Sequence, residues 1–345
     1  MRTQSESSVK EAEIRPDDLF DRYLELSRQD IAKLFSDPSE RRECPCPGCG
    51  GGNQLPAFEK HGFTYVECDD CRSLFVSPRP RPEALDRLYR DSDSSRFWAR
   101  EFFPAVAEAR REKIIGPRVQ RILERIALEP TDGGPRTVID AGAGAGVFLD
   151  ELRRARPGIE PIAVEPGAEL AEQCRQRALA LVQKPVERCH ELEGRGALVT
   201  SFEVIEHVYD PLGFVSALRD LAQPGGLVLV TGLGGDGFDI QMLWERSKSV
   251  SPPHHLNFLS VEGLERLFER AGCVDVEVET PGLLDVELVQ KEISNGARPE
   301  LPRFFNLLLE RRDQGVLDRF QRFLQEARLS SHTWIWARRP TERGH

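Results

Sequence analysis

The stretch Val138-Ile-Asp-Ala-Gly-Ala-Gly-Ala-Gly-Val-Phe-Leu149 decides the fold of this chain. A β-branched pair ends in Asp140, three glycines follow at alternate positions, and an apolar segment comes next. This order predicts a strand, a tight turn and a helix. Glycine permits a positive φ and lets a ligand approach the backbone closely. The helix that follows leaves unpaired N–H groups facing that ligand, so the turn predicts a binding site.

The spacing of the glycines separates two kinds of nucleotide-binding turn. The dinucleotide fingerprint G-x-G-x-x-G fails, because Val147 stands where its third glycine should be. An acidic residue followed by G-x-G-x-G resembles motif I of the class I S-adenosylmethionine (SAM) methyltransferases. The resemblance implies that four residues lie near the methionine end of SAM: Asp140, Gly142, Gly144 and Gly146.

Strands and helices alternate after this turn, which is typical of a parallel sheet. The second strand, 161–164, ends in Glu165-Pro166. An acidic side chain there is placed to accept hydrogen bonds from both ribose hydroxyls of the cofactor. We therefore predict that Glu165 and Pro166 bind the cofactor, together with Phe202 and Glu203 at the end of the fourth strand.

The segment Glu203-Val-Ile-Glu206-His207-Val-Tyr-Asp210-Pro211 resembles a signature of methyltransferases related to the ubiquinone-biosynthesis O-methyltransferase. If it begins a helical turn, Glu203, Glu206 and His207 share one face. Three interpretations stay open. His207 could act as a general base or orient a hydroxyl. The three side chains could hold a divalent cation such as Mg²⁺, as the resemblance suggests. The carboxylates could instead favour a helix N-terminus while His207 bonds to nearby backbone.

A second histidine segment is Ser251-Pro-Pro-His254-His255-Leu-Asn257-Phe258-Leu-Ser260. It is similar to a P-x-H-x-x-x-F-S run that overhangs the substrate side of the pocket in the same family. His255 fits that position best and His254 is adjacent, although both could equally brace the loop. Our predicted catalytic residues are His207, His255, His254 and Glu206.

The N-terminal part of the chain contains two C-x-x-C knuckles, Cys46/Cys49 and Cys68/Cys71. Their spacing is close to that of known zinc sites. Four thiolates make a closed tetrahedral site, which is structural and not catalytic. We therefore predict a zinc ribbon, with Cys44 as a spare thiol.

These motifs predict an α/β fold: a Rossmann-like, seven-stranded class I methyltransferase sheet whose last strand, 331–337, is antiparallel. We divide the chain into a disordered tail and N-terminal helix (1–40), a zinc ribbon (41–80), a helical connector (81–130) and the methyltransferase core (131–345). The tail is expected to reach residue 16. A helical insertion at about 283–330 is expected to form a lid or a dimer surface.

The composition of the chain argues against several classes of function. The net charge of the 345 residues is −10, which argues against nonspecific binding to nucleic acid or acidic membranes. The chain contains no apolar run of membrane-spanning length and no signal-peptide pattern at its N-terminus. We predict a cytoplasmic, SAM-dependent enzyme that methylates O or C of a small metabolite or sugar intermediate, with homodimerisation left open. The alternatives are a nucleic-acid or protein methyltransferase, or a non-catalytic interaction protein.

Overall fold

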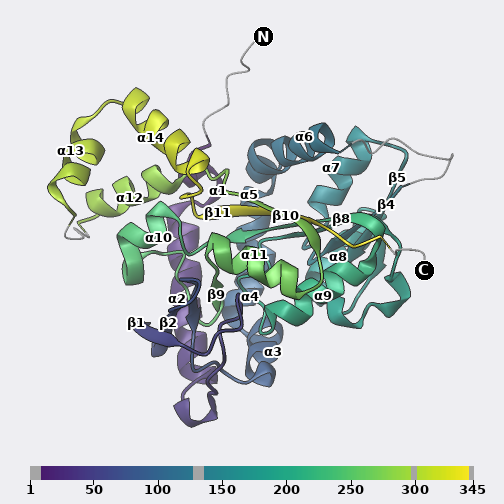
Figure 1. The fold of residues 1–345 in the computed structure, drawn as a ribbon, viewed down its shortest axis with the longest axis horizontal. Helices are drawn as coiled ribbons and strands as arrows, with labels where there is room; N and C mark the ends of the chain where they lie inside the picture. Colours follow the sequence, from purple (N-terminus) through teal and green to yellow (C-terminus); the bar gives the residue numbers. More distant parts are fainter. Residues whose placement is uncertain (1–8, 127–135, 297–300, 342–345) are drawn as a thin grey trace.

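The computed structural model describes residues 9–126, 136–296 and 301–341. Within these ranges the strands form two sheets, one of seven strands and one of four (Figure 1). The predicted boundary between the helical connector and the methyltransferase core, at 130/131, and the first half of the predicted tail lie outside the described residues.

The larger sheet has the strand order β10-β11-β8-β7-β4-β5-β6. Strands β4 to β8 pair in parallel, and β11 runs antiparallel to both of its neighbours, β8 and β10. This confirms the predicted seven-stranded class I topology. The central strands are rich in Val, Ile and Leu because helices cover both of their faces. The bounds are β4 Arg136–Ala141, β5 Ile159–Val164, β6 Ala180–Val182, β7 Gly196–Phe202, β8 Ala222–Leu233, β10 Val274–Glu279 and β11 His332–Arg338.

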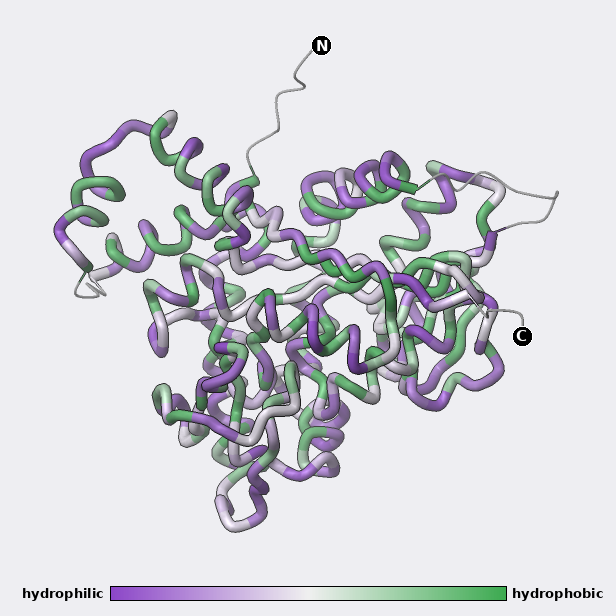
Figure 2. The backbone as a smooth tube through the Cα atoms, in the orientation of Figure 1, coloured by the Kyte–Doolittle hydropathy of each residue, from purple (hydrophilic) through white to green (hydrophobic). Residues whose placement is uncertain are grey.

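Two apolar cores separate this sheet from its helices. One face packs against α6 (Gly116–Arg125), α7 (Val147–Ala155) and α8 (Ala168–Gln176), and the other packs against α9 (Pro211–Leu221) and α11 (Val261–Arg270). Along these helices hydrophilic and hydrophobic positions alternate, as expected for helices with one buried face (Figure 2). The side chains of Asp210 and Ser260 cap α9 and α11 by accepting from the backbone N–H groups of Leu212 and Gly263.

The smaller sheet contains β1 (Gln54–Lys60), β2 (Phe63–Cys68), β3 (Leu74–Val76) and β9 (Asn257–Phe258), in that order. Strand β9 belongs to the second histidine segment, far from the others in the sequence. Leu74 pairs with Phe258, and Phe75 pairs with Asn257. The small sheet is therefore completed by a strand from the region that we assigned to the methyltransferase core.

Helices from the N-terminal third pack beside this small sheet (Figure 1). Helix α2 extends alongside α3 and α4, and Asp30 on α2 accepts from the backbone N–H groups of Asp93 (3.1 Å) and Ser94 (2.8 Å). The expectation of disorder up to residue 16 is wrong, because Glu11–Ile14 is helical and Glu11 is buried. The bounds are α1 Glu11–Ile14, α2 Asp17–Leu34, α3 Pro82–Asp91, α4 Asp93–Phe97 and α5 Phe103–Arg110, with π-helical turns at Trp98–Phe102 and Arg111–Ile115.

The predicted insertion forms α12 (Asp285–Ser294), α13 (Arg303–Arg311) and α14 (Gln314–Glu326) before the last strand. These helices project beyond the edge of the molecule near α10 (Phe238–Leu243), with which they share an apolar cluster (Figure 1). None of the helices in the described ranges combines the length and the hydropathy that a membrane span requires.

Candidate active site

A cavity of about 2340 Å³ lies where the parallel strands end at their carboxyl termini. Asp140, Glu165 and Phe202, which end or follow β4, β5 and β7, all line it. Ligands of open α/β sheets bind at this edge. The motif I turn and the Glu203–Pro211 segment therefore face the same space.

The three glycines of the turn have positive φ angles for different physical reasons. A Cβ on Gly142 (φ +73°) would lie 2.6 Å from Cγ2 of Val204, and one on Gly146 (φ +74°) would lie 2.5 Å from Cδ1 of Leu179. These two glycines allow close packing. At Gly144 (φ +55°) an added Cβ would meet no described atom within 4 Å. Gly144 is thus the glycine whose missing side chain leaves room for a ligand.

Two buried carboxyl groups flank this turn. Glu165 accepts hydrogen bonds from the N–H groups of Gly144 (2.9 Å) and Gly167 (2.8 Å), and burial raises its pKa to about 7. Asp140 accepts from Thr200 Oγ1 at 2.6 Å, and burial likewise raises its pKa to about 7. With the open space at Gly144 and the neighbouring Pro166, these residues fit the polar end and the ribose of SAM.

The helical turn on which Glu203, Glu206 and His207 would share one face does not form. The segment is a non-helical turn, and Glu203 itself has a φ of +55°. Its Oε1 accepts from Thr231 Oγ1 at 2.6 Å and lies 2.8 Å from His332 Nε2 and 3.2 Å from Arg118. Burial raises the pKa of Glu203, but its contacts with His332 and Arg118 outweigh this effect and hold the pKa below its usual value.

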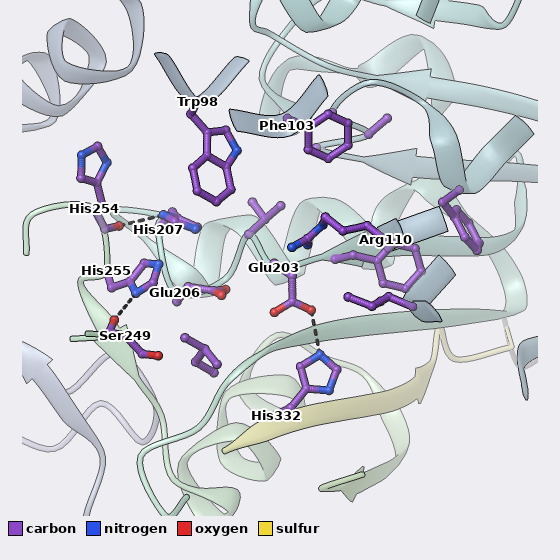
Figure 3. Close-up of a pocket in the computed structure, with 18 of the residues that line it drawn as sticks. Trp98, Phe103, Arg110, Glu203, Glu206, His207, Ser249, His254, His255 and His332 are labelled. Carbon is purple, nitrogen blue, oxygen red and sulfur yellow. Dashed lines mark hydrogen bonds and ion pairs between the residues drawn. The ribbon is translucent and has the colours of Figure 1, made fainter. Parts of the chain in front are cut away.

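Two imidazoles instead converge with Glu206 beside the cavity (Figure 3). His207 Nδ1 lies 2.9 Å from the carbonyl oxygen of His254, and His255 Nδ1 lies 2.5 Å from that of Ser249. Because a carbonyl oxygen only accepts, each Nδ1 carries the hydrogen and each Nε2 keeps a free lone pair. The two rings are 4.7 Å apart in an edge-to-face arrangement. Burial lowers the pKa of His207 to about 4, so this imidazole is neutral at physiological pH.

Glu206 completes this group. It is 2% exposed, and its Oε2 has no hydrogen-bond partner among the described residues. Burial and the charge of Glu203 raise its pKa well above the usual value. Ligand atoms of Glu206, His207 and His255 lie within 4.8 Å of one another. Two imidazoles and a single carboxylate do not fit Mg²⁺, which prefers oxygen ligands in octahedral geometry.

His254 is oriented differently from the other two histidines. Its ring lies 5.8 Å from the rings of Tyr23 and Tyr89, and it is turned away from Glu206 (Figure 3). Its Nε2 is buried with no partner in the described part of the chain, and burial lowers the pKa of the ring to about 3. The group of His254 that contacts His207 is its backbone carbonyl.

Sequence reasoning missed several side chains in the cavity. His332 lies on β11 and Tyr89 on α3, with the Tyr89 hydroxyl 3.3 Å from His207 Nδ1. No local pattern marks either residue, because each reaches the site through tertiary packing. Four aromatic residues lie close together in the segment 97–103. Phe97 and Phe102 are buried in an apolar cluster, whereas Trp98 and Phe103 line the cavity.

The four predicted zinc ligands do come together. The Sγ atoms of Cys46 and Cys71 are 3.6 Å apart, those of Cys49 and Cys68 are 3.5 Å apart, and all four lie within 4.8 Å of one another. Zn–S bonds of about 2.3 Å in a tetrahedron put sulfur atoms about 3.8 Å apart, so the cluster fits zinc. Cys44 is outside this cluster.

Hydrogen bonds connect the cysteine ribbon to the second histidine segment. Ser73 Oγ lies 3.3 Å from Cys71 Sγ and accepts from the backbone N–H of Ser260 at 3.1 Å. The hydroxyl of Tyr65 on β2 donates to the carbonyl oxygen of His255 at 2.6 Å. The ribbon therefore holds the second histidine segment at His255 and at its last residue, Ser260.

Asn257, on the shared strand β9, extends this connection to the first histidine segment. Its Nδ2 donates to the carbonyl oxygens of Ile205 (3.0 Å) and Val208 (2.9 Å). The buried Arg79 donates to Asn257 Oδ1 and to the carbonyl oxygen of Tyr209. The position of His207 thus depends on residues from both sheets.

Comparison with known proteins identifies the core of the chain. Residues 107–278 match a family model described as a methyltransferase domain. The chain is 35% identical over 100 residues to the ubiquinone biosynthesis O-methyltransferase of Serratia proteamaculans, covering 27% of this chain and 41% of that protein. It is 27% identical over 164 residues to the protein of the same name from Xanthomonas campestris, covering 45% and 66%. The chain thus spans less than half of the length of the Serratia relative.

Among solved structures, a phosphoethanolamine N-methyltransferase 2 of Haemonchus contortus in complex with SAM is similar, with a TM-score of 0.49 and 19% identity over 78% of this chain and 63% of that one. The family match covers β4, β5 and β7, the strands whose carboxyl ends carry the motif I turn, Glu165 and Glu203. Residues 107–278 therefore form a methyltransferase domain, and the seven-stranded sheet has the class I topology.

Proposed function

We propose that this chain transfers the methyl group of SAM to an oxygen or carbon of a small metabolite or sugar intermediate. One observation carries the proposal: Gly142 of the motif I turn packs against Val204, so the cofactor turn adjoins the segment that carries Glu206 and His207. A cofactor on the turn and an acceptor beside the imidazoles would then share one cavity.

The cofactor would supply an already activated methyl group on a sulfonium. Positioning of two bound molecules can therefore provide most of the rate enhancement. Glu165 would accept hydrogen bonds from the ribose hydroxyls once the ligand replaces Gly144 N–H or shares the carboxylate with it. His207, with its hydrogen fixed on Nδ1, would offer Nε2 to the proton of an acceptor hydroxyl or carbon acid.

His255 presents an equivalent Nε2 and would orient the same acceptor. Glu206, with its raised pKa, would be a neutral acid able to donate a hydrogen bond to one imidazole. No step in this proposal requires Mg²⁺, because Glu203 is engaged with His332 and Arg118. Zinc in the cysteine ribbon would have a structural role, since four thiolates leave no position for a substrate.

The proposal is tested by incubating the full chain with methyl-labelled SAM and four acceptor pools: hydroxylated metabolites, sugar nucleotides, tRNA and peptides. We expect label only in a small-molecule pool, in line with the net charge of −10. Label in tRNA or peptide would replace this acceptor class by a macromolecule. Tight NAD binding without SAM binding would contradict the activity itself.

A further inference from the structure

Arg110, the last residue of α5, lines the cavity. Its guanidinium makes no hydrogen bond or ion pair with any residue in the described ranges. We propose that Arg110, assisted by Arg15, binds a carboxylate or phosphate group of the acceptor. This inference rests on the proposed methyl-transfer function and adds the chemical class of the substrate.

Two carboxylates near Arg110, those of Glu203 and Glu11, are already engaged by other basic side chains. Glu203 is shared by Arg118 (3.2 Å) and His332 (2.8 Å). On the other side, Glu11 lies 3.8 Å from Arg15 and 2.7 Å from Lys291, so Arg15 shares its only described carboxylate with a lysine. Near Arg110, the guanidinium groups of Arg15 and Arg118 therefore already use the carboxylates of Glu11 and Glu203, and neither carboxylate is left for Arg110.

The lack of a carboxylate partner is reflected in the pKa of Arg110. Burial, together with the positive charges of Arg15 and Arg118, lowers the pKa of Arg110 to about 10, and Glu203 opposes this only in part. The side chain stays protonated at neutral pH but lacks the interactions that normally accompany a desolvated charge. An anionic ligand would supply them, and a planar guanidinium can bind a carboxylate or phosphate through two parallel hydrogen bonds.

The position of Arg110 favours the acceptor over the cofactor as the source of this anion. Arg118, not Arg110, is the arginine whose charge interacts with Asp140 at the motif I turn. The charge of Arg15 lowers the pKa of both Arg110 and His255, and all three residues line the cavity. Figure 3 shows Arg110 beside Glu203, with Trp98 and Phe103 on the adjoining wall. A ring-containing acid would contact these aromatic faces and the guanidinium together.

The test uses the full chain saturated with S-adenosylhomocysteine and calorimetric titration of two probes, inorganic phosphate and benzoate. Arg110→Met removes the charge at similar length, and Arg110→Lys keeps it without the planar fork. Arg22→Met, on the exposed surface of α2, is the matched control for net charge. We expect the affinity for at least one probe to fall about tenfold or more in Arg110→Met, the usual loss for charge-assisted hydrogen bonds. Arg110→Lys should recover part of it, and the control should be unchanged.

Two readouts separate this role from others. Affinity for S-adenosylhomocysteine should be the same in Arg110→Met as in the wild type, and the melting temperature should not fall, because the lost charge had no partner. Weakened binding of S-adenosylhomocysteine with unchanged binding of methylthioadenosine, which lacks the amino-acid carboxylate, would assign Arg110 to the cofactor and overturn the proposal. Equal probe binding by wild type and Arg110→Met, or none by either, would also overturn it.

The two probes distinguish a phosphate-bearing acceptor from a carboxylate-bearing one. Failure of the wild type to bind S-adenosylhomocysteine would contradict the proposed function instead. The anion titrations, repeated without that ligand, would then still decide whether Arg110 binds an anion.

Discussion

His332 Nε2 lies 2.8 Å from Glu203 Oε1, which joins the first residue of the last strand to the residue that follows β7. Together with Arg118 this contact fixes Glu203 beside the sheet and away from His207. Glu203 is therefore held by β11 and α6, while Glu206, His207 and His255 form a separate group beside the cavity.

Replacement of Glu203 by Gln should destabilise the fold. The nine-tenths-buried Arg118 would lose its only described carboxylate, and removing one partner of such a pair costs about 1–3 kcal/mol when the other partner is partly exposed. The measurement is urea unfolding of Glu203→Gln, Arg118→Met and the double variant. If the ion pair matters, the double variant should be more stable than the sum of the single losses predicts; strict additivity would contradict the coupling.

Gly144→Val and Gly146→Ala should separate ligand binding from packing. In Gly144→Val the side chain would enter open cavity space, so SAM affinity should be lost while the positive φ costs only about 1–2 kcal/mol of stability. In Gly146→Ala the new Cβ would collide with Leu179 in the core, so stability should fall further. Calorimetry and thermal melting of both variants check this. Normal SAM binding by Gly144→Val would place the cofactor elsewhere.

SAM affinity should increase with pH through about 7. Burial raises the pKa of Glu165 to about 7 from an ordinary 4.5, and only the ionised carboxylate accepts hydrogen bonds from both ribose hydroxyls through its two oxygens. The affinity should change by at most about tenfold per pH unit below 7. Glu165→Gln should remove this dependence, and Asp140→Asn, whose carboxyl also has a pKa of about 7, tests whether the other acid is responsible.

The stability of the ligand-free chain should change in the opposite direction. Because the pKa of Glu165 is raised on folding, the folded chain retains a proton that the unfolded chain releases. The stabilising contribution of Glu165 is complete below pH 4.5 and is lost as the pH rises through about 7.

For the affinity prediction, a SAM affinity of the wild type that does not change with pH would show that the ligand does not contact the carboxyl of Glu165.

His207→Ala or His255→Ala should lower turnover by about 10²–10⁴, the usual range for an acid–base group. SAM affinity should be preserved, since the cofactor residues lie on the turn and at the end of β5. His190→Ala, on an exposed side chain, is the matched control. Turnover, SAM affinity and melting temperature must be measured on the same preparations.

Combined loss of stability and SAM affinity in both histidine variants would mean that the imidazoles only brace their loops. Added Mg²⁺ should leave turnover unchanged, because Glu203 is unavailable as a ligand. Restoration of a chelator-treated enzyme by Mg²⁺ alone would contradict that assignment.

The chain should contain one zinc ion, held by the four clustered thiolates. Cys46→Ser and Cys71→Ser should lose the metal and lower the melting temperature, whereas Cys44→Ser should keep it because Cys44 lies outside the cluster. Metal loss should also shift the imidazole NMR signals of His207 and His255, since Ser73 and Tyr65 connect the ribbon to their loop. Metal-free protein with full stability and unshifted signals would refute both parts.

The sheet could be predicted from the sequence because each of its elements carries its own local pattern. The motif I turn, the acid after β5 and the alternating last strand can each be recognised within a short stretch of sequence. Together they resemble the class I methyltransferases, and the strand order follows from that resemblance. The cysteine cluster was equally accessible, since ligand spacing within each knuckle is a local property.

The acceptor side could be predicted only in part, because distant residues determine it. The helical turn that would align Glu203, Glu206 and His207 does not form. Glu203 instead contacts Arg118 and His332, which lie on α6 and β11 and could not be paired with it from the sequence. No local pattern distinguishes Arg110 from the other arginines of the segment 110–125, and only its place in the cavity shows that its charge lacks a partner among the described residues. Tyr89 likewise becomes part of the site through the packing of α3.

The pairing of β3 with β9 has a consequence for the order in which this protein is made. During synthesis the cysteine knuckles leave the ribosome long before Asn257 and Phe258, so β3 must wait with one unpaired edge. Such an edge is a template for mispairing with other chains. Metal bound early to the knuckles would leave this edge unpaired, so a truncated chain ending before β9 should aggregate even when its thiols are loaded.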